Sequence, residues 1–288
     1  MADQELSRAA AGPQAAAGPT WQGAPPPDLP PVTVPGWLRV VRRGVPAVLV
    51  LGLGVPLLML LRLIERPFTG LRRPVTGPFV QAVCRAVLFV IGLRWRRFGQ
   101  PMRGPGAVVA NHASWLDILV LNAAMPVFFV AKSEVASWPG INILTRVTDT
   151  HFVARDPRLA REQAAQFAAR TRAGHRLLFF PEGTSSDGQR VLPFRPTLFQ
   201  GFLAPDMPQG LAIQPVTLRY HAPAGADPRF YGWWGDMALG PHLLSVLSAP
   251  RQGRAQVTLH PPIPVAGHDR KSLSRQAEAA VRQGFAAA

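Results

Sequence analysis

The sequence of 288 residues contains one cysteine, Cys84. A single cysteine excludes a disulfide within the chain and any cysteine-based metal site built from one chain. Such low cysteine usage is typical of a reducing compartment. We therefore expect no structural disulfide, and nothing in the residue pattern calls for a bound metal or cofactor.

Acidic residues and lysines are also scarce. There are 16 Asp and Glu against 31 Lys and Arg, for a net charge of +15, and only Lys132 and Lys271 are lysines. A basic surface attracts polyanions, so the candidate partners are nucleic acid, an anionic membrane surface and an acidic carrier protein. Because the arginines are scattered and form no compact basic run, we expect no nucleic-acid partner.

Residues 1–36 have few side chains that could pack into a core. They are rich in Ala, Pro and Gly and include the stretch PPPDLPP at 25–31, which predicts a disordered lead. The start carries Asp3 and Glu5, and the apolar run begins only after residue 43. This pattern differs from that of a secretory signal peptide.

A long apolar segment follows, and residues 37–93 are predicted to be helical and membrane-associated. Residues 44–61 carry no charge over eighteen positions, which is at the lower limit for a helix that spans a bilayer. A second stretch, 78–93, is amphipathic because it contains Gln81 and Arg85. The alternatives are a single span, a helical hairpin in one leaflet, or an ordinary core helix; arginines on both sides of 44–61 leave the orientation open.

Residues 94–288 alternate between short apolar runs and helical patterns. Strands are predicted at 106–111, 127–132, 151–155, 176–181, 211–220 and 254–260, and helices at 156–173 and 269–284. Asp156 and Gly174 suit the two ends of the first helix. The alternation predicts an α/β domain with a largely parallel or mixed sheet flanked by helices. The aromatic cluster FYGWW at 230–234 suits either a core or a membrane-facing patch.

The stretch NHASWLD at 111–117 follows a strand and holds a candidate general base. His112 and Asp117 are five residues apart, so they are about 140° apart on one helix and on opposite faces of one strand. They can face each other only if His112 lies in a turn and Asp117 on the next helix. The carboxylate would then accept from one ring nitrogen, and the other would take a proton from a substrate hydroxyl. The alternative is that Asp117 caps backbone amides.

A second polar group, FFPEGTSSDG at 179–188, also follows a strand, where open α/β sheets bind ligands. Gly183 allows a sharp turn, and Thr184, Ser185, Ser186 and backbone amides could cradle an oxyanion or hydroxyls. Glu182 either anchors the loop or contacts a cationic group or hydroxyl. Arg155, at the end of another strand, suits a phosphate or carboxylate. The alternatives are a surface turn and an arginine paired with a neighbouring acid.

Together these stretches resemble the glycerolipid acyltransferases, the 1-acylglycerol-3-phosphate acyltransferase family. NHASWLD resembles the N-H-x4-D motif, FVAR the second block, FPEGTSS the F-P-E-G-T-R block and IQPVTLRY the fourth. The resemblance covers about residues 80–265. It implies that His112 is the general base, that Asp117 orients it, and that Arg155 and the 182–185 loop hold the acceptor head group.

The implied reaction moves an acyl chain from a thioester, acyl-carrier protein or acyl-CoA, to the hydroxyl of a lysolipid. The resemblance implies no acyl-enzyme, metal or cofactor. It also implies membrane lipids as partners, and an inner-membrane location with the site facing the cytoplasm.

One position departs from the family pattern. Ser185 stands where the family has an arginine after E-G-T, so phosphate binding would rest on Arg155, Arg190 or Arg195. The E-G-T-S-S-D-G form resembles the lyso-ornithine lipid O-acyltransferase subgroup. Because a bidentate donor is lost, we favour lyso-ornithine lipid over lysophosphatidate as the acceptor.

Two functions of other classes remain as alternatives. One is a basic membrane-anchored nucleic-acid-binding protein, supported only by the net charge. The other is an acyl-binding relative without turnover, against which the intact pair of His112 and Asp117 argues.

Overall fold

The computed structural model describes residues 21–104, 106–132, 148, 150–153 and 160–288. The helical elements are α2 (Val34–Thr69), α3 (Thr76–Ile91), α4 (Leu116–Ala124), α6 (Ala160–Arg172), the 3₁₀ segment η3 (Pro196–Leu203), α7 (Leu239–Ser248) and α8 (Arg270–Ala286). The strands are β1 (Arg94–Phe98), β2 (Gly106–Ala110), β3 (Phe128–Lys132), β4 (His151–Val153), β5 (Arg176–Phe179), β6 (Ala212–His221), β7 (Arg254–Leu259) and β8 (Ile263–Pro264).

The described strands form one mixed sheet in the order β1-β7-β6-β2-β5-β3-β4, with β8 paired to β6. The strands β6, β2, β5, β3 and β4 run parallel to one another. The strand β7 is antiparallel to β6, and β1 is parallel to β7. This confirms the predicted fold class. Because β2 and β5 are parallel neighbours, the loops that follow them emerge at the same edge of the sheet.

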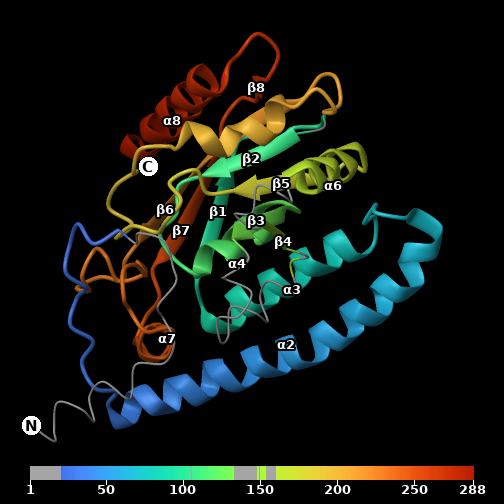
Figure 1. Cartoon of the computed structure of the whole chain (residues 1–288). Helices are drawn as coiled ribbons and strands as arrows, with labels where there is room; N and C mark the ends of the chain where they lie inside the picture. The colour runs from blue at the N-terminus through green and yellow to red at the C-terminus, as the bar shows by residue number, and fades with distance from the viewer. Residues whose placement is uncertain (1–20, 105, 133–147, 149, 154–159) are drawn as a thin grey trace, which may run out of the picture.

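Helices cover both faces of this sheet (Figure 1). Alternate side chains of a strand point to opposite faces, and β2 shows it: Val108 and Ala110 pack in the core under α3 and α4. Ala107 and Val109 pack in a second core under α8 and η3. The domain therefore has three layers, and the loop edge of the central strands is left for a site.

Most predicted elements are found within a few residues of their expected bounds. The helix predicted at 269–284 is α8, whose N-cap Asp269 accepts from Ser272 N. Gly174 after α6 has φ +85°, which confirms it as the residue that ends this helix. Residues 154–159, with the predicted N-cap Asp156, lie outside the described residues. The strand β1 and the helix α7 were not predicted; the sequence of β1, RWRRF, lacks an apolar run because this strand lies at the sheet edge.

The apolar N-terminal segment forms two helices that pack against each other, α2 and α3. The helix α2 runs through Pro46 and Pro56 and lies along the base of the domain (Figure 1). It is long and apolar enough to cross a membrane by length and composition, and 11% of its apolar window is buried. The core-helix alternative is therefore wrong for α2. It holds for α3, whose Val80, Cys84 and Leu88 are buried in the core of the α/β domain.

The segment before α2 differs from the expected disordered lead. Residues 1–20 lie outside the described residues, whereas residues 21–33 are described. In that part, Trp21 N donates to Thr184 Oγ1 at 3.2 Å, and Trp234 Nε1 donates to Ala24 O at 3.0 Å. The Ala-Pro-Gly composition suggested too few packing side chains, but backbone groups and one tryptophan provide these contacts.

Candidate active site

Asn111 fixes the turn that follows β2. Its amide Nδ2 donates to Leu218 O and its Oδ1 accepts from Leu218 N, both at 2.8 Å. Asn111 is buried, so these two bonds satisfy both ends of the amide inside the protein. The side chain thereby ties the end of β2 to the neighbouring strand β6, and the next residue, His112, starts from a fixed position.

His112 and Asp117 face each other across this turn, in the turn-and-helix arrangement that a pairing of the two residues requires. His112 Nδ1 lies 2.6 Å from Asp117 Oδ2, with Asp117 in the first turn of α4 and fully buried. Asp117 Oδ2 also accepts from the amides of Ala113 at 2.8 Å and Ser114 at 3.1 Å. The alternative reading, in which Asp117 caps amides, is therefore true at the same time as the pairing.

Asp117 has a fourth donor that the sequence did not indicate. The hydroxyl of Tyr220, on β6, donates to Asp117 Oδ1 at 2.8 Å. Four donors, together with the N-terminal end of α4, suit an ionised carboxylate in a buried place. This carboxylate is held on both oxygens, so its direction toward His112 is fixed.

The imidazole of His112 is fixed from a second side by Phe180, the residue after β5. The two rings stack with centroids 4.0 Å apart and an interplanar angle of 11°. The His112 side chain keeps 23% of its surface exposed. Because Nδ1 is paired with Asp117, Nε2 is the ring nitrogen left to meet a substrate hydroxyl.

The loop after β5 is bonded to the same turn. Ser186 N donates to His112 O at 2.9 Å, and Ser186 Oγ lies 3.3 Å from the same carbonyl. Gly183 has φ +74°, a conformation that favours glycine, as expected from its place in the loop. Thr184 and Ser185 are partly exposed next to it. The two predicted polar stretches therefore form one site, with the expected loop residues beside the expected base.

Glu182 points into the protein. It is 2% exposed, and among the described residues no donor reaches its carboxyl oxygens at hydrogen-bonding geometry. Burial raises its pKa to about 9, although the nearby amides of His112 and Leu192 act in the opposite direction. Glu182 is therefore neutral at pH 7. Of the two predicted roles, this placement favours an anchor for the loop over a direct contact with a cation.

The predicted arginine Arg155 lies outside the described residues. Two other arginines lie at the loop. Arg195 Nε is 3.1 Å from the position that a Cβ on Gly183 would take. Arg190 forms an ion pair with Asp187, with Nη2 and Oδ2 3.0 Å apart.

The aromatic cluster at 230–234 also supports the site. Tyr231 and Trp234 are buried, which shows that this cluster packs inside the protein. Trp233 N donates to Ala113 O at 2.8 Å, next to His112. Sequence reasoning left the cluster undecided, because aromatic residues alone do not indicate which backbone they contact.

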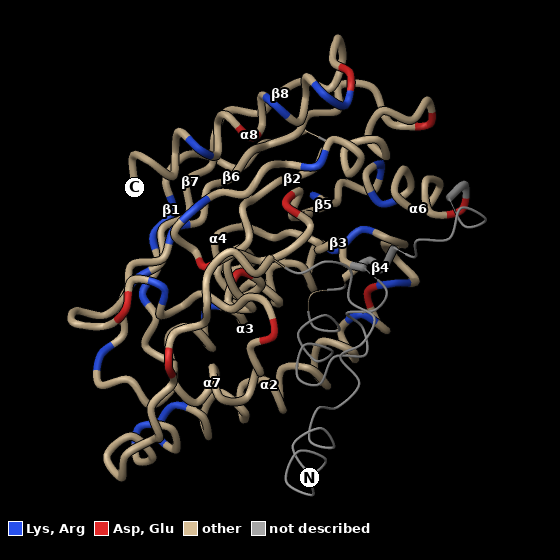
Figure 2. The backbone as a smooth tube through the Cα atoms, turned by 60° about the vertical axis from the view of Figure 1, so that its left-hand side comes forward, with Lys and Arg blue, Asp and Glu red and all other residues tan. Residues whose placement is uncertain are grey.

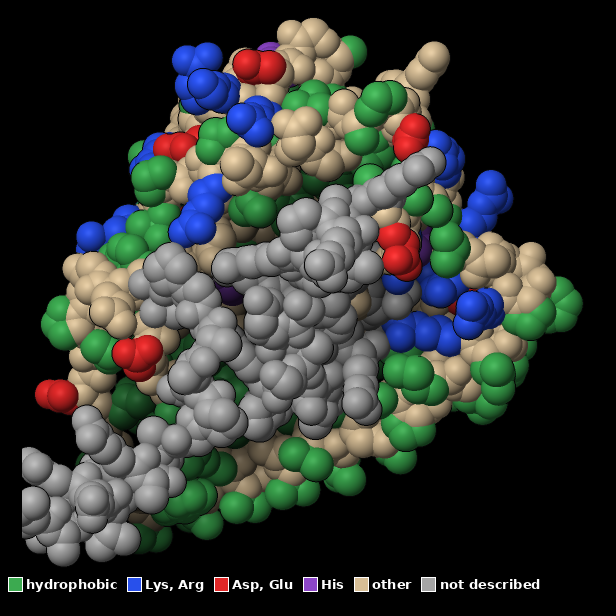
Figure 3. Space-filling view, viewed as in Figure 1, with side chains coloured by type: hydrophobic (Ala, Val, Ile, Leu, Met, Phe, Trp, Pro, Cys, Tyr) green, Lys and Arg blue, Asp and Glu red, His purple; other side chains and the backbone are tan. Residues whose placement is uncertain are grey.

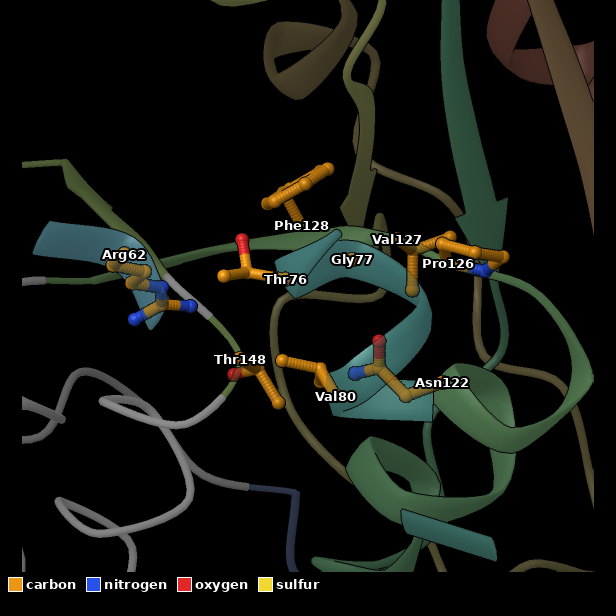
Figure 4. A pocket seen from close by; sticks show the side chains of 9 residues that line it. All are labelled: Arg62, Thr76, Gly77, Val80, Asn122, Pro126, Val127, Phe128 and Thr148. Carbon is orange, nitrogen blue, oxygen red and sulfur yellow. The ribbon is translucent and has the colours of Figure 1, made fainter. Parts of the chain in front are cut away.

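Two cavities lie elsewhere. One of ≈ 10 Å³ lies between α2, α3, α4 and β3 and is lined by Arg62, Thr76, Asn122 and Phe128, among others (Figure 4). That volume suits about one water molecule. The other, of ≈ 530 Å³, lies beside the turn between α2 and α3 and is lined by residues that include Phe68, Arg72, Arg73 and His175. Neither is lined by His112 or Asp117.

Comparisons with known proteins identify the family of the chain. A family model described as Acyltransferase matches residues 96–219. A lyso-ornithine lipid O-acyltransferase from Rhodobacter capsulatus is 52% identical over 269 residues, which cover 93% of this chain and 97% of the relative. A 1-acyl-sn-glycerol-3-phosphate acyltransferase from Neisseria gonorrhoeae is 36% identical over 119 residues, 41% of this chain and 45% of that protein.

The fold has a solved counterpart. The crystal structure of a 1-acyl-sn-glycerophosphate acyltransferase from Thermotoga maritima matches with a TM-score of 0.54 at 20% identity, over 85% of this chain and 97% of that one. At this identity the match shows the fold alone. The Rhodobacter relative, matched almost from end to end, shows the family: the chain belongs to the glycerolipid acyltransferases and is an acyltransferase that acts on lysolipids.

Proposed function

We propose that this enzyme transfers a fatty acyl chain from an acyl thioester to the hydroxyl of lyso-ornithine lipid, forming ornithine lipid. The observation that carries the proposal is the imidazole of His112, held by the buried Asp117 at 2.6 Å and by Phe180, with Nε2 left for the acceptor. A histidine in this setting is suited to general base catalysis on a hydroxyl.

The chemistry needs only groups of this site and the two substrates. His112 Nε2 takes the proton of the acceptor hydroxyl as its oxygen attacks the thioester carbonyl. Asp117 stabilises the imidazolium that forms. The C–O bond then replaces the C–S bond, and the proton passes from the imidazolium to the departing thiolate, which leaves as a thiol. No covalent acyl-enzyme is required.

The identity of the acceptor rests on the 182–185 loop and on the relatives. Ser185 replaces the arginine that suits a phosphate, and the Rhodobacter relative carries the name of a lyso-ornithine lipid enzyme. A lyso-ornithine head group offers a carboxylate, for which one arginine fork is enough. The alternative acceptor is 1-acylglycerol-3-phosphate, in which case Arg190 and Arg195 would have to bind the phosphate.

The acyl donor is proposed to be acyl-carrier protein or acyl-CoA, because both are anionic thioesters. Lys and Arg are spread over the helices and strands of the whole chain (Figure 2). A basic surface of this kind attracts an acidic carrier or a nucleotide phosphate. In the sequence, the arginines form no compact basic run of the kind that many nucleic-acid-binding segments have.

The placement of α2 supports a helix that lies in one leaflet of the membrane. Its buried residues Arg43, Gly54, Leu58 and Glu65 follow each other at spacings of eleven, four and seven, so they form one stripe toward the domain. Arg43 Nη1 donates to Leu247 O at 2.8 Å near one end. Near the other, Glu65 Oε1 accepts from Val75 N at 2.7 Å. A helix fastened at both ends lies along the domain and does not project from it.

The other flank of α2 suits the lipid side. Leu53 and Leu63 are 73% and 72% exposed, and hydrophobic side chains run along the lower edge of the molecule, where α2 lies (Figures 1 and 3). The cleft with Arg72 and Arg73 beside Phe68 would sit at the level of the lipid headgroups. We propose an inner-membrane location with the site facing the cytoplasm, where the acyl thioesters are made.

An acyl-transfer assay with purified protein tests the proposal. Wild type is expected to acylate lyso-ornithine lipid from acyl-carrier protein or acyl-CoA, and His112→Ala to lose this activity. His268→Ala, at a partly exposed histidine next to α8, is the matched control and is expected to keep it. Activity of His112→Ala near that of the wild type contradicts the proposed base. Turnover of lysophosphatidate alone contradicts the proposed acceptor.

A further inference from the structure

A short N-terminal strap, residues Trp21–Pro25, crosses the loop that follows β5. Trp21 N donates to Thr184 Oγ1 at 3.2 Å, and the ring of Trp21 lies 6.1 Å from that of Trp234. Farther along, Ala24 O accepts from Trp234 Nε1 and Pro25 O accepts from Arg229 Nη1, both at 3.0 Å. The strap is therefore fixed at its beginning and at its end.

The strap also contacts Arg190. The guanidinium carbon of Arg190 lies 5.2 Å from the centre of the Trp21 ring, within the range of a cation–π contact. Arg190 Nε and Nη2 donate to the two oxygens of Asp187, at 3.2 and 3.0 Å. Asp187 is 1% exposed whereas the Arg190 side chain is 52% exposed. The guanidinium is thus fixed by a ring and a carboxylate, and half of its side chain faces outward with further N–H donors.

The position of Arg190 is near the catalytic histidine. Trp21 contacts Thr184, and Ser186, two residues on, donates its amide to His112 O at 2.9 Å. Two residues of chain span at most about 7 Å. Ser186 Oγ also lies 3.3 Å from Arg190 O. The loop that carries Arg190 is therefore bonded to the backbone of the His112 turn, which brings the strap and the proposed base to the same edge of the sheet.

We propose that the strap and Arg190 form one wall of the acceptor's head-group site, in which Arg190 donates to the acidic group of the lysolipid and Trp21 holds its guanidinium in place. Arg190 thereby makes the head-group contact that the arginine of the family pattern would make at the position of Ser185. An arginine side chain that is already ordered loses less conformational freedom when it binds a carboxylate or phosphate, so Trp21 and Asp187 strengthen binding without touching the lipid. The inference rests on the proposed function in that the acceptor is a lysolipid with an acidic head group.

Steady-state kinetics in mixed micelles test this wall, with lyso-ornithine lipid and lysophosphatidate as acceptors. The variants are Trp21→Ala, Trp21→Phe, Arg190→Lys and the double variant Trp21→Ala/Arg190→Lys. Lysine keeps the charge next to the buried Asp187 but lacks the planar fork. Leu29→Ala, at a side chain 37% exposed beyond the strap, is the control.

Trp21→Ala and Arg190→Lys are each expected to raise KM for the acceptor about tenfold, the value of one charge-assisted hydrogen bond, with kcat within about twofold. Trp21→Phe should keep most of the affinity because it keeps a ring, and Leu29→Ala should match the wild type. The double variant should be no worse than Arg190→Lys, because both changes act on one contact.

Other results overturn the inference. If the KM of Trp21→Ala for the acceptor lies within twofold of the wild-type value, whether or not its Tm is lower, the strap has only a structural role. Effects that multiply in the double variant show that Trp21 and Arg190 act separately. If the wild type acylates lysophosphatidate only, the proposed acceptor is wrong. The same comparison of KM values, made with lysophosphatidate, then tests whether the strap and Arg190 bind a phosphate head group. If it acylates neither lysolipid, the proposed function is wrong. The inference is then tested by comparing the equilibrium binding of the two lysolipids to the wild type and to the same variants.

Discussion

The charge of Asp117 can be removed with little change to its shape, by Asp117→Asn. Asp117 Oδ2 accepts from His112 Nδ1, Ala113 N and Ser114 N, and Oδ1 accepts from the Tyr220 hydroxyl. An asparagine can place its Oδ1 toward the three nitrogen donors and its amide toward Tyr220, whose hydroxyl can rotate to accept. The variant should therefore fold and keep His112 in place, while the developing imidazolium loses its anionic partner.

The size of the effect follows from the contact. With His112 Nδ1 and Asp117 Oδ2 2.6 Å apart, the centres of charge are about 4 Å apart, and at an effective dielectric constant near 20 the attraction is about 4 kcal/mol. We expect kcat to fall by about a thousandfold, since about 1.4 kcal/mol corresponds to a factor of ten. KM for both substrates should change little, because Asp117 is buried and does not contact them.

The assay is acyl transfer at saturating donor and acceptor, together with thermal unfolding of each variant. The control is Asp206→Asn, at an exposed acid, which should match the wild type. A fall in kcat of less than about tenfold in a folded Asp117→Asn variant would refute the reasoning. It would mean that hydrogen bonds to the turn, and not the charge, are what Asp117 contributes.

Three further changes test other parts of the structure. Tyr220→Phe removes the donor to Asp117 Oδ1, so the free energy of unfolding should fall by about 1.5–3 kcal/mol in a denaturant titration, with a smaller loss of kcat than in Asp117→Asn. Glu182 has an ordinary pKa of 4.5 when unfolded and about 9 when folded, so the wild type should lose stability as pH rises between these values. Glu182→Gln removes this loss, so the Tm of this variant minus that of the wild type should grow from pH 5 to pH 9. A difference in Tm that does not change with pH contradicts a Glu182 that is protonated in the folded protein. Leu53→Glu/Leu63→Glu on the exposed flank of α2 should weaken binding to lipid vesicles by about 100-fold in a flotation assay, at about 1.5–3 kcal/mol per buried leucine; unchanged flotation contradicts the leaflet placement.

Short-range features of this chain could be predicted from the sequence. The apolar runs predicted six of the strands, because a buried parallel strand such as β2 leaves a continuous apolar signal and β7 leaves an alternating one. The spacing of His112 and Asp117 identified the one arrangement in which they can face each other, a turn and then a helix, and the structure has that arrangement. In both cases the residues that decide the outcome lie within a few positions of one another.

Contacts between distant segments could not be predicted in this way. Tyr220 is separated from Asp117 by 103 residues, and Trp21 from Thr184 by 163. The order of strands in the sheet brings Tyr220 to Asp117, and no local pattern carries that order. Trp21 lies in a stretch whose composition indicates disorder, because composition measures side-chain packing and misses backbone groups that bond to a folded surface.

The site contains two buried carboxyl groups, Asp117 and Glu182, close to the turn that holds His112. Their surroundings favour opposite protonation states. Asp117 has four donors, which suit a negative charge, whereas no donor reaches the oxygens of Glu182 at bonding geometry among the described residues. Burial holds the pKa of Glu182 at about 9, and the negative charge of Asp117 also raises it. An ionised Glu182 would be a second buried anion close to Asp117. The neutral form leaves Asp117 as the anionic partner of His112, which suits the proposed role of His112 as a general base.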